Sequence, residues 1–203
     1  MIVDVLTFEI EKAKQLLTDD EKFLPKNVEK SIQFCVHSKI DFVLSRNEDS
    51  RSCEDACKKR FRLGDVGIPL HDELKTLVYK GFGKDGHGKI VVVHCRGNVY
   101  INLKNVTRLL SLESLPKMMK SKELLRCFEA KTGTVNPMLL EISSDHHVCH
   151  IFDIGLTFSM PNSLKTIMTN AGDRTWGIEF DPKLLISSMK NSCIGVISMP
   201  EKL

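Results

Sequence analysis

The sequence predicts a single α+β (mixed α/β) domain, in which helices flank a mixed, partly barrel-like central β-sheet. The chain has 203 residues, of which 42% are apolar and 27% charged. This length and balance suit one globular domain with a well-buried core. Short apolar segments that are typical of strands recur along the chain, whereas the helical segments are too few and too unevenly placed for a doubly wound parallel sheet.

The first 35 residues have the pattern of two helices separated by Pro25. Their apolar positions fall on one stripe before the proline and a second stripe after it, namely Ile10, Ala13, Leu16 and Leu17, then Val28, Ile32 and Val36. We therefore expect residues 1–38 to form a packed helical extension and residues 39–203 to form the main domain.

The centre of the predicted sheet lies between residues 40 and 110. Residues 40–44 alternate like a short strand, and Ser52 with Asp55 forms a capping box for a helix that we expect to end at Gly64. Strands follow at 74–80, 89–95 and 99–103. The third strand leads into a helix whose inward residues are predicted to be Val106, Leu109 and Leu110.

The second half of the chain continues the mixed pattern. Ser121 is the predicted N-cap of a helix that ends at Phe128, and strands are expected at 148–152, 167–170 and 176–180. Asp181 and Pro182 are typical of an N-cap and first helical residue. A last strand is expected near residues 194–197.

A glycine-rich loop, Gly81-x-Gly83-x-x-Gly86, has the letters of a dinucleotide-binding fingerprint, and Gly83 to Lys89 nearly matches a phosphate-binding loop. A fingerprint needs a helix directly after it and an acid about 20 residues further on, and a phosphate loop needs Ser or Thr after its lysine. Here Ile90 follows Lys89 and begins a strand. The loop is therefore predicted to be a flexible hairpin connection.

Histidine and cysteine are the candidate metal ligands. The densest cluster is His146, His147, Cys149 and His150 together with Asp145, and further pairs occur as Cys35-x-His37 and Cys53-x-x-x-Cys57. None of these has the spacing of a structural zinc site, and alternation along a strand would put His146 and His150 on one face and His147 and Cys149 on the other. We expect surface and half-buried histidines and no metal. Cys95 is expected in the core.

The composition indicates a soluble, cytoplasmic protein. The longest apolar run, residues 90–93, is far below the roughly 20 residues needed to span a membrane, and acids near the N-terminus argue against a secretory signal. Seven cysteines at irregular spacing suit reduced thiols. The net charge is only +3. Two basic groups, residues 58–62 and the set Lys117, Lys120, Lys122 and Arg126, are typical of solvated helix faces.

Three segments carry the functional hypothesis. Lys75 opens a strand, Gly133-Thr134-Val135-Asn136-Pro137 forms a later turn, and Asn170-Ala171-Gly172 closes the pattern. A lysine on a strand supplies a fixed positive charge, and such a loop supplies backbone N–H groups, which together suit a small anionic or ester-bearing ligand. Each segment alone also has a structural interpretation: a strand-edge lysine, a helix cap followed by a stop, and an ordinary turn.

In this order, and followed by Gly177-Ile178-Glu179-Phe180-x-Pro182, the segments resemble the YbaK/prolyl-tRNA-synthetase-associated family of aminoacyl-tRNA editing domains over residues 40–195. The resemblance implies hydrolysis of the ester of a mischarged tRNA without metal, cofactor or covalent nucleophile. It implies that Lys75 is catalytic, and that substrate is bound by Gly133, Thr134, Val135, Asn136, Pro137, Asp153, Asn170, Ala171 and Gly172. It also implies tRNA as partner, with an aminoacyl-tRNA synthetase as a second candidate.

Two positions depart from the family pattern. Asn47 stands where many relatives have a histidine, and Asn136 precedes Pro137 where serine is common. Because both positions belong to the expected pocket, the sequence does not identify the amino acid that would be removed from the tRNA. Two alternatives are a module on the same fold that binds tRNA or protein without turnover, and a metal-dependent hydrolase built on the histidine cluster. If the resemblance holds, either basic group could instead contact the phosphates of the tRNA acceptor stem.

Overall fold

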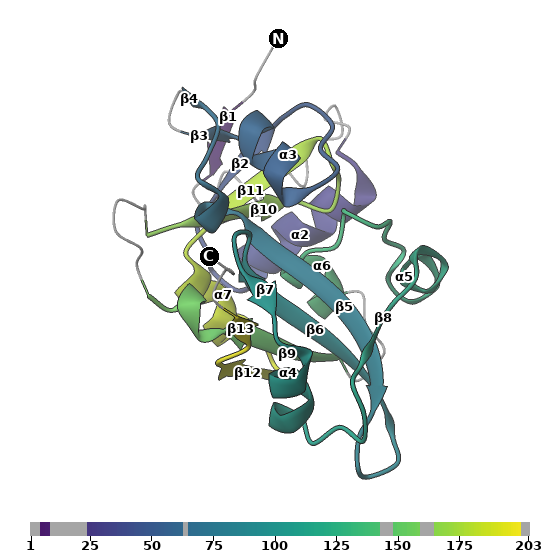
Figure 1. The fold of residues 1–203 in the computed structure, drawn as a ribbon. Coiled ribbons are helices and arrows are strands. Elements are labelled where there is room, and N and C mark those ends of the chain that lie inside the picture. Colours follow the sequence, from purple (N-terminus) through teal and green to yellow (C-terminus); the bar gives the residue numbers. More distant parts are fainter. Residues whose placement is uncertain (1–4, 9–23, 63–64, 143–147, 159–164, 200–203) are drawn as a thin grey trace.

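The computed structural model describes residues 5–8, 24–62, 65–142, 148–158 and 165–199, and it has the predicted mixed α+β class (Figure 1). Its strands are β1 (Val5–Phe8), β2 (Phe42–Arg46), β3 (Phe61–Arg62), β4 (Asp65–Val66), β5 (Leu74–Phe82), β6 (Gly88–Arg96), β7 (Tyr100–Ile101), β8 (Lys117–Met118), β9 (Val148–Asp153), β10 (Ile167–Asn170), β11 (Trp176–Phe180), β12 (Ser192–Gly195) and β13 (Ser198–Met199). The α-helices are α2 (Lys26–His37), α3 (Cys53–Lys59), α4 (Leu103–Leu109), α5 (Ser121–Phe128), α6 (Pro137–Ile142) and α7 (Pro182–Ser188), and the 3₁₀ turns are η1 (Leu70–Asp72) and η2 (Ile154–Leu156).

A five-stranded sheet has the order β12-β9-β6-β5-β8. β9 runs parallel to β6 and β12, whereas β5 is antiparallel to β6 and β8. The glycine-rich loop joins β5 to β6 as the predicted hairpin, with Gly86 at a φ of +76° that favours glycine. Because a strand follows this loop, the dinucleotide and phosphate-loop interpretations do not apply.

The other large sheet is antiparallel, with the order β1-β2-β11-β10. It meets the first sheet at a bridge between Glu73 and Met168 and at a hydrogen bond of 3.2 Å from Thr169 Oγ1 to the Leu74 carbonyl. The mixed class is as predicted, but the prediction of one partly barrel-like sheet is wrong in detail, since the described strands form two large sheets, two two-stranded sheets and no closed barrel. Strand pairing between residues so distant in sequence is not visible in local patterns.

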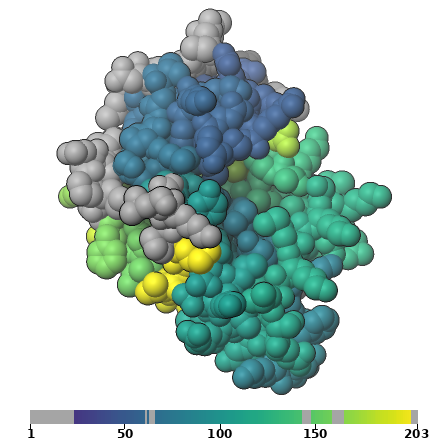
Figure 2. All heavy atoms as spheres, viewed as in Figure 1, coloured from purple at the N-terminus to yellow at the C-terminus, as the bar shows by residue number. Residues whose placement is uncertain are grey.

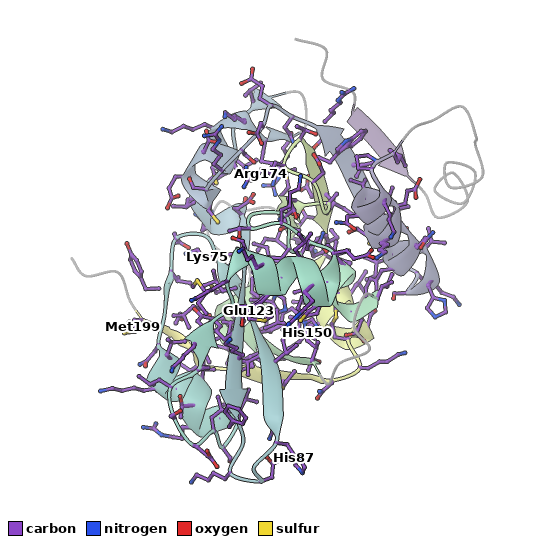
Figure 3. All side chains as sticks on the ribbon, turned by 90° about the vertical axis from the view of Figure 1, so that its right-hand side faces the viewer. Lys75, His87, Glu123, His150, Arg174 and Met199 are labelled. Carbon is purple, nitrogen blue, oxygen red and sulfur yellow. The ribbon has the colours of Figure 1, made fainter. Side chains whose placement is uncertain are left out.

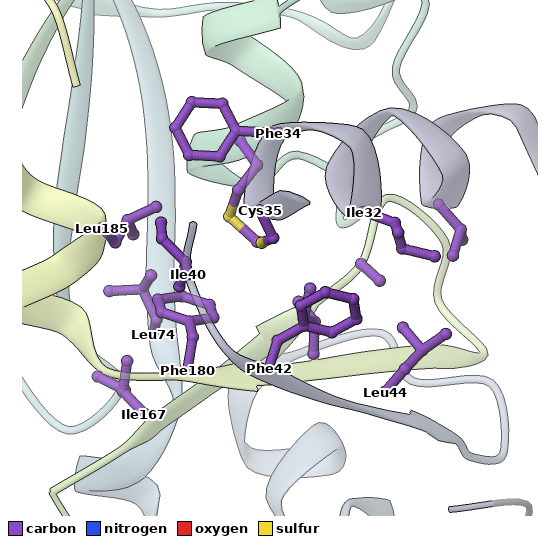
Figure 4. Close-up of a cluster of buried hydrophobic side chains, with 14 of the residues drawn as sticks. Ile32, Phe34, Cys35, Ile40, Phe42, Leu44, Leu74, Ile167, Phe180 and Leu185 are labelled. Atoms are coloured by element: carbon purple, nitrogen blue, oxygen red, sulfur yellow. The ribbon is translucent and has the colours of Figure 1, made fainter. Parts of the chain in front are cut away.

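The largest part of the core lies between α2 and the four-stranded sheet. Val28, Ile32 and Cys35 on α2 are fully buried against residues of β2, β10 and β11. Figure 4 shows Ile32 and Cys35 on the helix above Phe42 and Leu44 on the strand. Residues 26–37 thus share one core with the main domain, and the helix predicted around residues 10–17 falls outside the described residues.

Four local predictions were wrong. The strand expected at 99–103 is only β7, which pairs with β13 and not with the central sheet. Leu109, expected to face inward, is 43% exposed. Helix α3 ends at Lys59, before Gly64. Finally, Lys120 rather than Ser121 is the N-cap of α5, because the Ser121 hydroxyl contacts Thr132 Oγ1 instead.

The first basic segment is a solvated face only in part, at the exposed Lys58. Arg60 and Arg62 are buried and pair with three carboxylates: Arg60 with Glu73 at 3.3 Å, and Arg62 with Asp72 at 2.6 Å and Glu179 at 2.9 Å. Burying a charge is costly unless it is paired in this way. The second basic group, Lys117, Lys120, Lys122 and Arg126, is exposed as predicted. No helix in the described part of the chain is long and apolar enough to span a bilayer.

Candidate functional site

A pocket of about 320 Å³ lies beside the edge of β5 that faces β8. Its walls come from the segment before and within α3, from β5, from Met118, Met119 and Leu124, and from the loop around Gly133. Figure 2 shows this hollow between the blue surface of α3 and the green surface of α5. Most of the wall is apolar, with a few polar groups at fixed positions, which is the usual composition of a small-molecule site.

The pocket brings together Lys75, Gly133, Val135 and Asn170. These residues belong to the three sequence segments that were predicted to act together, although almost 100 positions separate the first from the last. Figure 3 shows Lys75 beside α5, with Arg174 above it. The convergence requires both sheets, because Lys75 lies on β5 and Asn170 ends β10.

The Lys75 ammonium is held by the segment at the start of β7. Its Nζ donates a hydrogen bond of 2.9 Å to the Val99 carbonyl and lies 5.9 Å from the centroid of the Tyr100 ring. An ammonium has three protons, so this bond leaves donor capacity for a ligand. The side chain is half-buried, and such a partly desolvated charge attracts an anion more strongly than one in bulk water.

The loop at 133–137 divides into a part that lines the pocket and a part that supports it. Gly133 has a φ of +82°, and Val135 lies on the pocket wall. Thr134 is buried and bonds the Lys131 backbone in both directions, at 3.1 and 2.9 Å. Asn136 is fully buried, and Pro137 begins α6. Thr134, Asn136 and Pro137 therefore do not line the pocket.

The segment 170–172 is divided in the same way. Asn170 lines the pocket, and its Nδ2 donates to the Val135 carbonyl at 3.0 Å, which ties the two segments together. Ala171 is fully buried in the main core. Gly172 has a φ of +105°, and a Cβ there would lie 2.6 Å from the Asn27 carbonyl oxygen. The close approach that requires glycine here is to α2 and not to a ligand.

Asp153 does not line the pocket. Its carboxylate accepts hydrogen bonds from the backbone N–H groups of Gly155 at 2.9 Å, Ile197 at 3.1 Å and Ser198 at 2.8 Å. These bonds fix the turn after β9 and the segment before β13. Asp153 is thus an anchor of the fold, and an acid after a strand could not be assigned this role from sequence because two of its three partners, Ile197 and Ser198, lie more than 40 residues away.

Several lining residues were not singled out by their sequence. Arg51, Ser52 and Glu54 form part of the rim, and Thr76 lies on the β5 wall. The only sequence signal was Ser52, whose hydroxyl accepts from the Asp55 N–H at 3.1 Å as the predicted cap. Asn47 contacts Arg60. With its amide oxygen turned toward the arginine, Asn47 accepts hydrogen bonds from Arg60 Nη1 at 3.0 Å and from the Gly177 N–H at 3.1 Å.

The pocket contains one cysteine, Cys53. Burial and the nearby Glu73 carboxylate raise the pKa of Cys53 to about 11. At neutral pH the side chain is therefore a thiol, whereas a nucleophilic cysteine has to be a thiolate. The pocket thus offers a fixed positive charge, and not a thiolate nucleophile.

His150 differs from its prediction because it is fully buried. Cys149 precedes it on β9 and is half-buried, as expected for a side chain on the other face of the strand. His146 and His147 lie outside the described residues. Across residues 5–8, 24–62, 65–142, 148–158 and 165–199, no group of three or more His, Cys, Asp or Glu side chains is placed to hold a metal ion. Cys95 is fully buried, as predicted.

The sequence matches the model of the aminoacyl-tRNA editing domain over residues 47–174. This range covers more than half of the chain and contains every residue that lines the pocket. The chain belongs to the aminoacyl-tRNA editing domain family. The family resemblance inferred from Lys75, the 133–137 loop and the 170–172 segment is thereby confirmed.

Solved structures share the fold of this editing domain. The hypothetical protein APE2540 is 17% identical with a TM-score of 0.65, and the match covers 84% of this chain and 100% of that one. A protein proposed to be a trans-editing enzyme for prolyl tRNA synthetase is 14% identical with a TM-score of 0.65, over 87% of this chain and 99% of that one. At such identities the likeness establishes the fold alone. A search of curated protein sequences finds no significant match.

Proposed function

We propose that this editing domain is a trans-editing deacylase, a hydrolase that cleaves the ester joining a wrong amino acid to the terminal adenosine of a tRNA. The observation that carries the proposal is the convergence of Lys75, Gly133 and Asn170 on one pocket within the region that matches the family. The proposal includes mischarged tRNA as substrate, a cytoplasmic location, an aminoacyl-tRNA synthetase as a further partner, and no metal or cofactor. It assigns the editing domain to residues 39–203.

In the proposed reaction the Lys75 ammonium stabilises the oxyanion that develops on the ester carbonyl or holds the terminal nucleotide. Fixed charge at such a position is worth most in the transition state, because it does not have to reorganise. Backbone N–H groups of the Gly133 loop orient the carbonyl, and water or a hydroxyl of the substrate attacks. The apolar residues Val78, Met119, Leu124 and Val135 surround the amino-acid side chain.

Exclusion by size is the proposed basis of selectivity. The apolar part of the wall can distinguish substrates by only about 1–3 kcal/mol per methylene, so it rejects mainly what does not fit. The Gly133 loop has little freedom to widen, because Asn170 bonds the Val135 carbonyl and Pro137 begins a buried helix. A tRNA carrying an amino acid larger than the target would not fit the pocket, and its ester would not be hydrolysed.

Deacylation of a panel of mischarged tRNAs tests the proposal. We expect turnover of one or a few substrates with small or medium apolar side chains, and strong suppression of this turnover in Gly133→Val. At a φ of +82° a β-branched residue is strained, and its side chain would contact Arg174. Gly86→Val is the matched control, because Gly86 has a φ of +76° in the β5–β6 hairpin with open space around it.

If the wild type binds tRNA but hydrolyses nothing in the panel, the alternative of a non-catalytic binding module is favoured. If Gly133→Val and Gly86→Val both keep the wild-type turnover, the Gly133 loop has only a structural role. Loss of tRNA binding in Gly133→Val would contradict the separation of the pocket from the exposed basic residues.

A further inference from the structure

A chain of polar side chains leads from the pocket through the core to helix α6. Thr76 lines the pocket, and its Oγ1 lies 3.1 Å from Nδ1 of His94, its cross-strand partner on β6. Nε2 of His94 lies 2.9 Å from Nδ1 of His150 on β9. Nε2 of His150 is in turn 3.3 Å from Oε2 of Glu141 on α6, an ion-pair contact without the geometry of a hydrogen bond.

The two histidines are fully buried. Their rings stack with centroids 5.1 Å apart and an interplanar angle of 7°, and Phe152 stacks on His94 at 4.4 Å. Burial, together with the neighbouring His150, holds the pKa of His94 well below its usual value, so the ring is neutral at pH 7. Two polar rings in an apolar core cost free energy. Packing alone does not explain them, because Val92 and Ile151 fill adjacent strand positions with apolar groups.

The acid at the end of the chain sets the direction of the hydrogen bonds. Contact with His150 lowers the pKa of Glu141, so this side chain is an acceptor at neutral pH. The carboxylate therefore favours the tautomer of His150 with its proton on Nε2, which leaves Nδ1 to accept from His94 Nε2–H. His94 Nδ1 then accepts the Thr76 hydroxyl proton. The remaining lone pairs of Thr76 Oγ1 are left as acceptors for a group in the pocket.

We propose that Thr76 Oγ1 takes a proton from the attacking water while His94 and His150 carry the displaced proton away from the pocket and the Glu141 carboxylate stabilises it on His150. This inference rests on the deacylase function proposed above. As the water oxygen bonds to the ester carbon, its proton passes to Thr76, and the Thr76 proton passes to His94 Nδ1. His94 gives its Nε2 proton to His150 Nδ1, and His150 becomes an imidazolium whose Nε2 lies 3.3 Å from the Glu141 carboxylate.

The reverse transfer completes the reaction. When the ester C–O bond breaks, the ribose oxygen leaves as an alkoxide and takes a proton from Thr76. His150 returns its Nδ1 proton to His94 Nε2, His94 passes its Nδ1 proton to Thr76, and the original tautomers are restored. One water is consumed, and one carboxylic acid and one ribose hydroxyl are formed. Thr76 is the catalytic residue in this scheme, whereas His94, His150 and Glu141 are positioning residues that act through it.

Thr76→Val is the sharpest test, because valine has the shape and strand preference of threonine but no hydroxyl. In steady-state deacylation we expect kcat to fall by about 10²-fold with KM nearly unchanged, the usual scale for losing general acid–base assistance. Thr76→Ser restores the hydroxyl and should recover most of kcat. An unchanged kcat in Thr76→Val, or a raised KM alone, would overturn the proposal.

Glu141→Gln tests the far end of the relay without touching the pocket. The neutral amide cannot stabilise the His150 imidazolium, so kcat should fall and the solvent deuterium isotope effect on kcat should change. Glu123→Gln is the matched control, since Glu123 is a helical acid that pairs with Lys80 at the surface. Equal kcat and isotope effects in the two variants would overturn the relay.

The histidine tautomers give a readout that does not depend on activity. Nitrogen-15 NMR at neutral pH should find both Nδ1 atoms without protons in the wild type, and a shifted tautomer population in Glu141→Gln. The opposite tautomers would overturn the inference even in an active protein. If the wild type deacylates and Lys75→Ala does not, but Thr76→Val is fully active, the relay fails and the deacylase function survives. If the wild type is inactive on every mischarged tRNA, the deacylase function fails, and the catalytic role of Thr76 fails with it.

Discussion

Arg60 and Arg62 show how the surroundings of a residue decide its role. In sequence they belong to a basic run that is typical of a solvated surface. In the structure they are buried against Glu73, Asp72 and Glu179. Removal of one partner from such a buried pair typically costs about 3–5 kcal/mol, because the remaining charge is left without compensation. Local charge patterns cannot reveal this pairing, since Glu179 lies more than 100 positions away.

At the residue scale, the cysteines are expected to react with iodoacetamide in a defined order. Cys193 and Cys149 lie on the neighbouring strands β12 and β9, and the Cys149 thiol lowers the pKa of Cys193 to about 7 by hydrogen bonding. Cys193 therefore has more thiolate at neutral pH than an ordinary cysteine, and the thiolate is the reactive form. Burial raises the pKa of Cys57 and Cys95 to about 12. Peptide mass spectrometry should therefore find Cys193 alkylated first.

Cys149→Ala should slow the alkylation of Cys193, because the pKa returns toward its ordinary value near 9. Cys127→Ala, at another half-buried cysteine, is the control and should leave the rate unchanged. Faster labelling of Cys95 than of Cys193 in the native protein would show that the described packing around these thiols is wrong.

At the scale of elements, Asn136 joins the pocket loop to three other segments. Its Oδ1 caps α6 by accepting from the Leu139 N–H at 2.8 Å, and its Nδ2 donates to Ser31 Oγ at 3.0 Å and to the Asn170 carbonyl at 3.1 Å. Asn136→Ala should destabilise the protein by about 2–4 kcal/mol, the sum of a lost cap and unsatisfied buried groups. Denaturant unfolding measures this change.

Asn102→Ala is the matched control, because Asn102 caps α4 but makes no comparable buried bonds through its amide nitrogen in the described structure. Its loss should cost about 1 kcal/mol, the usual value for a cap. Equal destabilisation by the two substitutions would mean that the bonds to Ser31 and Asn170 contribute nothing.

The elements that the sequence predicted best are those that local chemistry controls. Asp181 caps α7 at the predicted residue, with Pro182 in the first turn, and β10 and β11 have the expected bounds. Lys75, Gly133 and Asn170 were expected in one site and line one pocket. Predictions failed where distant partners decide: the division into two sheets, and the use of Asp153 and Gly172 to anchor the fold. Thr76 was missed because only its pairing with His94 across β5 and β6 distinguishes it.

At the scale of the whole molecule, the exposed basic group adjoins the pocket. Lys117 precedes Met118, which lines the pocket, and Lys120, Lys122 and Arg126 follow on and beside α5. Replacement of these four cations by glutamine should weaken tRNA binding and reduce the slope of log K against log salt by about 3, since each phosphate contact contributes roughly 0.7–0.9. Binding measured over a salt series tests this.

The control replaces four exposed cations on or beside α4 and α7, namely Lys104, Arg108, Lys183 and Lys190. This variant has the same net charge but should keep the wild-type slope. If both variants reduce the slope equally, the whole surface attracts tRNA by net charge, and the basic group beside the pocket has no special role.

In the proposed reaction the Lys75 charge promotes ester hydrolysis in the pocket. Single-turnover deacylation by Lys75→Ala, compared with Lys80→Ala on the same strand, tests it most directly. Lys80 is exposed and pairs with Glu123 on α5, so its loss should change the rate little. We predict a fall of about 10²-fold or more for Lys75→Ala alone, the usual scale for losing one group that stabilises developing charge. A folded Lys75→Ala variant that hydrolyses mischarged tRNA at the wild-type rate would show that the Lys75 charge does not promote ester hydrolysis.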